Sequence, residues 1–191
     1  SHFRPMIDEY ECLLTGNIII QERTRGVGVL PAELAKSFGC TGPNLRASGV
    51  AYDVRKNRPY GYYDRFDFKM ATATAGDSWS RYAVRIEEMR QSLRIIEQAL
   101  EQMPKSGPVL AKVPGVVKVA PGRYLSRVEA ARGEIAYYLV GDGSPKPYRA
   151  KIRSPNFSNL AAFPHIVAGW RVADVVTILS TFDVVIPDID R

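Results

Sequence analysis

The clearest hydrophobic pattern of the chain lies between residues 77 and 104. Apolar side chains recur there at steps of three and four and form one stripe, made of Tyr82, Ile86, Met89, Leu93, Ile96, Leu100 and Met103. This spacing predicts an α-helix of about seven turns with one apolar face. Asp77 or Ser78 can cap its first turn, and Pro104 ends it. We expect the stripe to pack in a helical core.

Weaker patterns precede this helix. We expect a helix from Ile7 to Leu14, a helical or extended piece from Ile18 to Arg23, and a short helix from Pro31 to Phe38. Gly39 follows the third segment, and proline at a helix start with glycine after its end is a common arrangement. Glycines and prolines are frequent among tyrosines from residue 40 to 76, which predicts a long packed loop.

Strand patterns follow the long helix. Residues 105–121 are rich in proline, glycine and valine and predict a connector with a short strand around Val116–Val119. Alternating runs at Arg123–Glu129, Glu134–Val140 and Tyr148–Arg153 predict a small antiparallel meander.

Helical patterns return after the meander. Ser154 and Pro155 predict the start of a helix that runs through Leu160 and breaks near Pro164, and a further helix is expected from Val172 to Thr181. We therefore expect a mostly helical α+β fold. Its parts would be a helical region 1–104, the connector 105–121, the sheet 122–153, and C-terminal helices with a tail at 154–191.

Composition narrows the class of protein. The chain of 191 residues carries a formal net charge of +6, but arginines alternate with glutamates at spacings such as Arg85 and Glu88, which favours ion pairs on a solvated helix face. No base-reading motif accompanies the charge, so nucleic acid is not an expected partner. The two cysteines, Cys12 and Cys40, exclude a disulfide-rich scaffold and a four-cysteine metal site within the chain.

The start of the chain and the apolar runs bear on targeting. No apolar run reaches the roughly 18 to 20 residues that span a bilayer. The opening Ser1-His2-Phe3 lacks an initiating methionine and suggests a cut fragment or the remnant of a tag.

Familiar catalytic motifs are weak. His2 and His165 are the only histidines, and the apolar neighbours of His165 favour a packed side chain. Gly26-Val27-Gly28 lacks the third glycine of a dinucleotide fingerprint. Three stretches are better candidates for a functional site. They are the glycine-bounded segment around Arg46, the charged turn around Arg132, and the apolar end from Asp183 to Arg191, which contains three aspartates.

Thirteen stretches together resemble one family, the D subunit of NADH-quinone oxidoreductase (respiratory complex I), which is hydrogenase-large-subunit-like. They are Ile7–Glu11, Leu14–Asn17, Arg25–Gly28, Thr41–Pro43, Leu45–Val50, Tyr82, Val84–Leu93, Lys146–Arg149, Lys151–Arg153, Phe157, Asn159–Leu160, Pro164–His165 and Asp190–Arg191. The resemblance implies a nickel–iron-hydrogenase-large-subunit-like fold and only the C-terminal half of the usual subunit. The family's quinone-contacting tyrosine and histidine belong to the other half, so no residue here inherits a catalytic role.

The resemblance also implies site residues. Asp183 and Val185 match residues that line the family's quinone cavity, and we expect Arg132 and Arg46 to support that lining from behind. Related nickel–iron hydrogenases carry a pattern like Asp-Pro-Cys-x-x-Cys near this end. Here Val185 and Asp188 replace both thiolates, so no metal site is expected. The family usually has proline directly before the arginine that matches Arg132, and this chain has Ala131 there. The resemblance therefore does not fix the orientation of the Arg132 side chain.

The implied function is a peripheral, cytoplasmic-side subunit of an inner-membrane NADH-quinone oxidoreductase that translocates protons. This chain would bind no cofactor, iron–sulfur clusters and NADH would belong to partner subunits, and quinone would be the substrate of the assembled complex. The isolated chain would be inactive. Two alternatives stay open. The first is the same type of subunit in a complex that takes electrons from ferredoxin or a deazaflavin, or in a hydrogenase-related complex. The second is a basic scaffold that binds partners or nucleic acid and takes no part in electron transfer.

Overall fold

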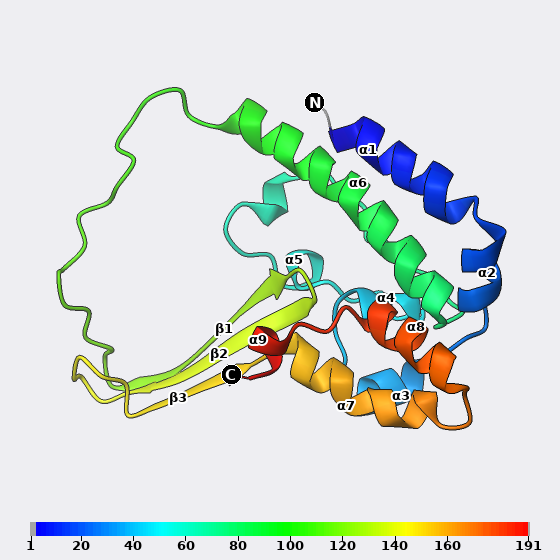
Figure 1. The fold of residues 1–191 in the computed structure, drawn as a ribbon. Helices are drawn as coiled ribbons and strands as arrows, with labels where there is room; N and C mark the ends of the chain where they lie inside the picture. Colours follow the sequence, from blue (N-terminus) through cyan, green and yellow to red (C-terminus); the bar gives the residue numbers. More distant parts are fainter. Residues whose placement is uncertain (1–2, 191) are drawn as a thin grey trace.

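Helix α6 (Ser78–Gln102) is the longest element and crosses the molecule from one side to the other in the computed structural model (Figure 1), which describes residues 3–190. Ser1, His2 and Arg191 lie outside the described residues. The predicted cap is confirmed, since Asp77 Oδ1 accepts a hydrogen bond from the backbone N–H of Ser80 at 2.7 Å. Asp77 Oδ2 also accepts from the backbone N–H of Gly26 at 2.8 Å, so one carboxylate holds two distant segments together.

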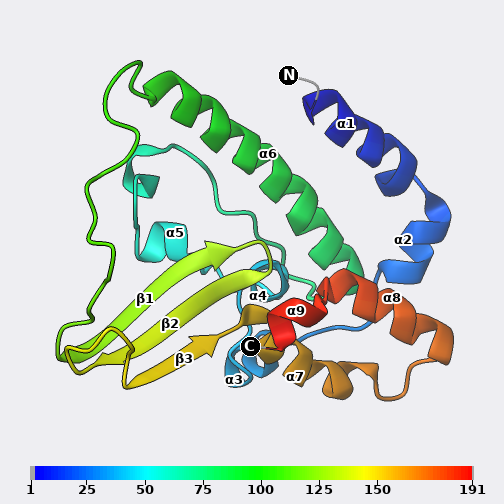
Figure 2. The same cartoon turned by 60° about the vertical axis from the view of Figure 1, so that its left-hand side comes forward.

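The apolar stripe of α6 is packed over only part of its length. Ile86 is buried and Tyr82, Met89 and Leu93 are half-buried, whereas Ile96, Leu100 and Met103 are 52%, 62% and 57% exposed. The expectation that the whole stripe packs in a helical core is therefore wrong for its last three members. The first half of α6 packs against other helices of the chain, while α1 is the helix that accompanies its second half (Figures 1 and 2).

The N-terminal helices agree with the predicted pattern, with shifted boundaries. Helix α1 (Phe3–Tyr10) runs into a π-helical turn, η1 (Glu11–Thr15), and α2 (Ile18–Thr24) is helical rather than extended. Asn17 caps α2 because its Oδ1 accepts from the backbone N–H of Ile19 at 2.9 Å. Helix α3 (Ala32–Ser37) lies where a short helix is predicted.

The segment from residue 40 to 76 is not all loop, contrary to the prediction. It contains α4 (Pro43–Ala47), α5 (Val54–Asn57) and a 3₁₀ turn, η2 (Tyr63–Arg65). The φ of +71° at Gly42 turns the chain into α4, and the Asp53 side chain caps α5 by accepting from the backbone N–H of Arg55. All five residues of α4 are buried, so tertiary packing stabilises a helix too short to form alone.

The predicted meander is confirmed. Strands β1 (Gly122–Ala130), β2 (Gly133–Gly141) and β3 (Arg149–Arg153) form an antiparallel sheet in the order β1-β2-β3, with Glu129 opposite Glu134. The sheet extends away from the helices, and its β1–β2 turn points back toward α4 and α6 (Figure 2).

The connector between α6 and β1 arcs away from the other elements (Figure 1), and Val116 and Val117 are exposed there. The prediction of a short strand around Val116–Val119 is wrong, because that segment pairs with no neighbouring strand in the described structure.

Three helices end the described chain: α7 (Pro155–Val167), α8 (Val172–Phe182) and α9 (Ile186–Ile189). The break expected near Pro164 is wrong, since α7 continues through it. Ala162 and Ile166 on either side are buried in the main core with Ile178 and Phe182, and this packing offsets the hydrogen bond that proline cannot make.

His165, predicted to be packed among apolar neighbours, has an exposed side chain. Its ring still contacts one of them in space, since the ring centroids of His165 and Phe38 lie 4.9 Å apart. Among the described residues, no helix is long and apolar enough to span a bilayer.

Candidate functional site

A cleft of about 600 Å³ lies between α6, the α1–η1 segment and the β1–β2 turn. Its apolar wall is formed by Leu14, Ile86, Met89, Ala130 and Ala131, with the rings of Tyr10, Tyr63 and Tyr82. Charged side chains face it as well, namely Arg55, Arg85, Glu88, Glu129 and Asp183. A mainly apolar cleft with a few convergent polar groups is the usual form of a small-molecule site.

Asp183 is held at the cleft by Arg132. Arg132 Nη2 donates to Asp183 Oδ1 at 3.0 Å, and Arg132 Nε lies 2.9 Å from Asp183 Oδ2. Asp183 ends α8 with a φ of 55°, the left-handed conformation that aspartate tolerates better than most residues. The backbone carbonyl of Asp183 also accepts from Asn156 Nδ2 at 3.4 Å. Both the side chain and the backbone of Asp183 are thus fixed by neighbouring elements.

Arg46 is fully buried and lies next to the cleft-lining residues Glu88 and Glu129. Its Nε donates to Glu88 Oε1 at 2.8 Å, its Nη2 donates to Glu129 Oε1 at 3.0 Å, and its Nη1 lies 3.7 Å from Asp53 Oδ2. Burial opposes its charge, but these carboxylates together raise the pKa of Arg46. Arg46 and Arg132 therefore both stand next to cleft-lining carboxylates without lining the cleft themselves.

The structure separates the other predicted lining residue from this cleft. Val185 is half-buried at the start of α9, two residues after Asp183, and does not contribute to the cleft wall. Sequence reasoning misses Glu88 and Glu129 as cleft residues. Glu129 could have been predicted, because it belongs to the charged turn around Arg132. Glu88 could not, because its spacing along α6 predicts a pair with Arg85 instead.

The prediction of an ion pair between Arg85 and Glu88 on one face of the helix is wrong. Glu88 pairs with Arg46, and Arg85 instead donates to the carbonyl of Arg81 at 2.9 Å and to Asn44 Oδ1 at 3.4 Å. Spacing of three residues permits a pair but does not enforce it, and here a buried guanidinium from α4 binds the Glu88 carboxylate.

Two arginines on α6 are held mainly by uncharged groups. Arg81 is fully buried and donates to the carbonyls of Gly76 and Gly28 and to the hydroxyls of Ser78 and Thr181. Burial lowers the pKa of Arg81 and of Arg85, the latter despite the charge of Asp183 nearby. Arg85 lines the cleft, whereas Arg81 does not.

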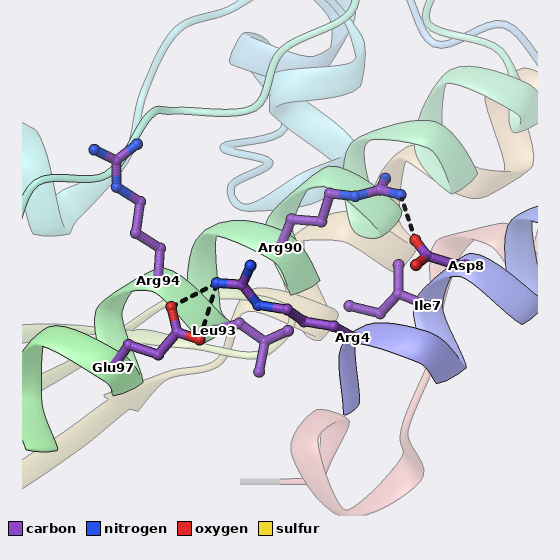
Figure 3. A pocket seen from close by; sticks show the side chains of 7 residues that line it. All are labelled: Arg4, Ile7, Asp8, Arg90, Leu93, Arg94 and Glu97. Carbon is purple, nitrogen blue, oxygen red and sulfur yellow. Dashed lines mark hydrogen bonds and ion pairs between the residues drawn. The ribbon is translucent and has the colours of Figure 1, made fainter. Parts of the chain in front are cut away.

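A second hollow lies between α1 and α6 and is lined by Arg4, Ile7, Asp8, Arg90, Leu93, Arg94 and Glu97. Figure 3 shows Arg4 paired with Glu97 and Arg90 paired with Asp8 along it, with the Arg94 guanidinium directed elsewhere. These side chains are largely exposed, which makes the pairs weak surface contacts. We assign no chemistry to this hollow.

The cysteines and acidic side chains do not assemble a metal site in the described part of the chain. No group of three or more histidine, cysteine, aspartate or glutamate residues there could hold a metal ion. Cys12 is exposed, and Cys40 is buried, which raises the pKa of its thiol to about 11.

Comparison with known proteins identifies the family. The family model described as "Respiratory-chain NADH dehydrogenase, 49 Kd subunit" matches residues 1–119 and 112–191 of the chain. The chain belongs to this family. The D subunit of the NADH-quinone oxidoreductase of Syntrophobacter fumaroxidans is 52% identical over 184 residues, which cover 96% of this chain and 49% of that protein. The corresponding protein of Clostridium beijerinckii is 49% identical over 183 residues, which cover 96% and 49% of the two chains.

One solved structure is similar over the whole length of the chain. One chain of the membrane-bound sulfane sulfur reductase, an archaeal respiratory membrane complex, has a TM-score of 0.92 and 40% identity, covering 100% of this chain and 52% of that chain. The predicted resemblance to the D subunit is therefore confirmed. The chain spans about half the length of the curated relatives it matches.

Proposed function

We propose that this chain forms part of the quinone cavity of a membrane-associated NADH-quinone oxidoreductase. Electrons would come from an iron–sulfur cluster of a neighbouring subunit, and quinone reduction would be coupled to proton translocation. The chain would sit peripherally against a membrane arm, on the cytoplasmic side of the inner membrane. The observation that carries this proposal is the cleft, in which an apolar wall faces the Asp183 carboxylate held by Arg132.

The chemistry of the cleft suits a quinone headgroup. The ring needs apolar and aromatic contacts, which Ile86, Met89 and the tyrosines supply, while its two oxygens need a few polar partners. Asp183 and Arg132 would orient or polarise the headgroup from one side. Val185 lies outside the wall of this cleft and would instead line the part of the cavity that the N-terminal half of the family's subunit completes.

The test uses membranes that carry the assembled complex with Asp183→Asn or Val185→Met. Donor oxidation by an artificial acceptor is measured beside quinone reduction. We expect quinone reduction to fall and its inhibitor sensitivity to change, while the artificial-acceptor rate stays at the wild-type level. The matched controls are Asp67→Asn and Val172→Met, which alter exposed side chains away from the cleft.

The outcomes separate the alternatives. If both activities fall together in Asp183→Asn and Val185→Met, the residues serve folding or assembly and the cavity assignment is wrong. If neither variant changes either activity, the result favours a scaffold without redox work.

A second candidate keeps the architecture and changes the reactants. The 40% identity to a chain of a sulfane sulfur reductase favours it, because the same fold then occurs in a respiratory complex with a different acceptor. Reduced ferredoxin or a reduced deazaflavin as donor, and polysulfide as acceptor, are tested in the same membranes. A rate with these reactants that exceeds the rate with NADH and quinone would select this candidate.

A further inference from the structure

The positive charge of the chain is concentrated in one region, residues 105–153, which we call the basic lobe. It consists of the connector and the three-stranded sheet, and it contains ten lysines and arginines and three acidic residues, a net charge of +7. The rest of the chain contains sixteen basic and seventeen acidic residues, a net charge of −1. The net charge of +6 therefore belongs to this lobe and not to the surface as a whole.

Most cations of the basic lobe have no counter-ion. Arg127, Arg132 and Arg153 are engaged at the inner end of the sheet, next to the helices. The other seven are exposed and make no ion pair within 4.0 Å among residues 3–190, namely Lys105, Lys112, Lys118, Arg123, Lys146, Arg149 and Lys151. The charge of these seven side chains is thus available to a partner.

The nearby carboxylates do not balance these seven cations. Glu129 and Glu134 lie at the inner end of the sheet and already contact side chains of residues 40–76. Asp142 lies in the turn between β2 and β3, and Glu101 lies in the last turn of α6 before the connector; both are exposed. Even if each of these two neutralised one cation, five positive charges would remain in excess.

Three of the unpaired cations share one face of the sheet. Arg123 of β1 and Arg149 of β3 both lie opposite Val140 of β2, and Lys151 lies two residues beyond Arg149. Opposed residues of antiparallel strands, and residues two apart along a strand, lie on the same face. Leu125 lies on this face too and is 54% exposed. The outer part of this face therefore combines exposed apolar surface with unpaired positive charge.

The connector adds apolar side chains that the chain leaves uncovered. It arcs away from the other elements (Figure 1), and its end is fastened to the sheet because the backbone N–H of Gly143 donates to the carbonyl of Val119 at 2.9 Å. Single exposed apolar side chains are ordinary, whereas a run of them in one segment marks an interaction surface. Five in this segment are at least 61% exposed, namely Val109, Leu110, Val113, Val116 and Val117.

We propose that the basic lobe docks onto an acidic protein surface of a neighbouring subunit, an inference that rests on the proposed function for the existence of the complex. The exposed cations of β1 and β3 pair with aspartate and glutamate side chains of that subunit. The connector lies in an apolar groove of the same subunit and buries its valines there. Complementary charge speeds the association and fixes its orientation, while the burial of apolar surface stabilises it.

The backbone of the connector favours a protein over a lipid surface. Among residues 3–190, its only hydrogen bonds are those accepted by the carbonyls of Val119 and Ala120. Unpaired N–H and C=O groups are costly in hydrocarbon, whereas an extended segment can pair with the backbone of a partner protein. Segments that lie on membranes are usually amphipathic helices, and the connector is not helical and contains no Trp or Phe.

A second copy of the chain is a poorer occupant. Outside the basic lobe, the chain has nearly equal numbers of basic and acidic residues. That part of a second copy therefore has no net charge to match the +7 of the lobe.

The first test labels and cross-links the lysines of the purified complex in detergent. A carbodiimide joins an amine to a carboxylate that contacts it, and acetic anhydride labels amines that are free. Lys112, Lys118 and Lys151 are the probes, and Lys69, which is also exposed and makes no ion pair within the described residues, is the matched control. We expect the probes to label several-fold more slowly than Lys69 and to form cross-links to Asp or Glu residues of one neighbouring subunit.

The other outcomes of this test overturn the proposal. Probes that label as fast as Lys69 and form no such cross-links show that the lobe is uncovered. Protection that disappears when phospholipid is removed assigns the lobe to the membrane surface. Cross-links that join only copies of this chain assign it to a second copy.

The second test reverses charge in the assembled complex. One triple variant changes three lysines of the lobe, and the matched control makes the same change in net charge at three exposed cations elsewhere. We expect the cross-linked subunit to be lost from the first variant and retained in the control, and rising salt to release it from the wild type, since salt screens exposed charges. The two variants are Lys112→Glu/Lys118→Glu/Lys151→Glu and Arg58→Glu/Lys69→Glu/Arg171→Glu.

A third variant, Lys112→Gln/Lys118→Gln/Lys151→Gln, removes the charge without reversing it and should show a smaller loss of the subunit. Retention at the wild-type level in both lobe variants overturns the proposal, as does an equal loss in the control. Neither test uses quinone. A complex that forms the cross-links but reduces no quinone leaves the docking intact and contradicts the proposed function, whereas quinone reduction with uncovered probes overturns only the docking.

Discussion

Arg132 and Asp183 lie 51 positions apart in the sequence and meet at the cleft, with Arg132 Nη2 3.0 Å from Asp183 Oδ1. The two side chains are 33% and 37% exposed, so water screens the pair. Their contribution to the free energy of unfolding should therefore be small even if their role in the site is large.

We predict that a double-mutant cycle of Arg132→Leu and Asp183→Asn gives a coupling energy of about 0.5–1 kcal/mol. Urea unfolding of the 191-residue chain and of the three variants measures it. A coupling above about 3 kcal/mol would show that the pair is desolvated and holds the fold rather than serving mainly the site.

Gly42 allows the β1–β2 turn to touch the start of α4. A Cβ atom on Gly42 would lie 2.5 Å from the Cα of Gly133 and 2.6 Å from the carbonyl oxygen of Arg132, and its φ is +71°. We predict that Gly42→Ala costs at least about 3 kcal/mol, because backbone atoms must move apart. Gly61 has a φ of +59° with nothing within 4 Å of such a Cβ, so Gly61→Ala should cost only about 1 kcal/mol.

These two glycine variants are compared by urea unfolding of the same chain. Equal costs for Gly42→Ala and Gly61→Ala would contradict the close contact between the turn and α4.

The two halves of the α6 stripe should respond differently to truncation. Ile86 is 7% exposed and lines the cleft, whereas Leu100 is 62% exposed. Ile86→Ala should cost about 2–4 kcal/mol, because it removes buried apolar contacts. Leu100→Ala should change the unfolding free energy of this chain by less than about 0.5 kcal/mol. Thermal and urea unfolding measure both, and a large cost for Leu100→Ala would show that the second half is covered in solution.

Asp77 should make stability depend on pH. Burial opposes its charge, but the backbone N–H of Gly26 and the hydrogen bonds of Ser80 lower its pKa below the usual value. A lowered pKa in the folded state means that the stabilisation is present above the unfolded pKa of about 4 and is lost as pH falls through the folded pKa.

We therefore predict that Asp77→Asn, which keeps one acceptor oxygen, destabilises the chain by about 1–2 kcal/mol at pH 7. The difference from the wild type should shrink as pH falls below about 4. Urea unfolding at pH 7, 5 and 3 gives the comparison, and a gap that is constant over this range would mean that the carboxylate charge plays no part.

Local chemistry made several elements predictable. The capping Asp77 with its apolar stripe specified α6, and alternating residues with glycine-rich turns specified the three strands. These signals act over one to three turns or one strand, so neighbouring residues carry them completely. The family likeness could also be read from the sequence, because its motifs extend over nearly the whole chain.

Only the tertiary structure decided which groups meet. It buried Arg46 in α4, brought it to Glu88 instead of leaving Glu88 to Arg85, and placed Glu129 at the cleft. It also continued α7 through Pro164 and left the end of the α6 stripe uncovered. Each of these outcomes depends on contacts between segments that are far apart in the sequence. Periodicity and capping say which face of an element is apolar, but the partner of a buried charge is chosen by packing, since its desolvation must be offset by whatever the fold brings within hydrogen-bond distance.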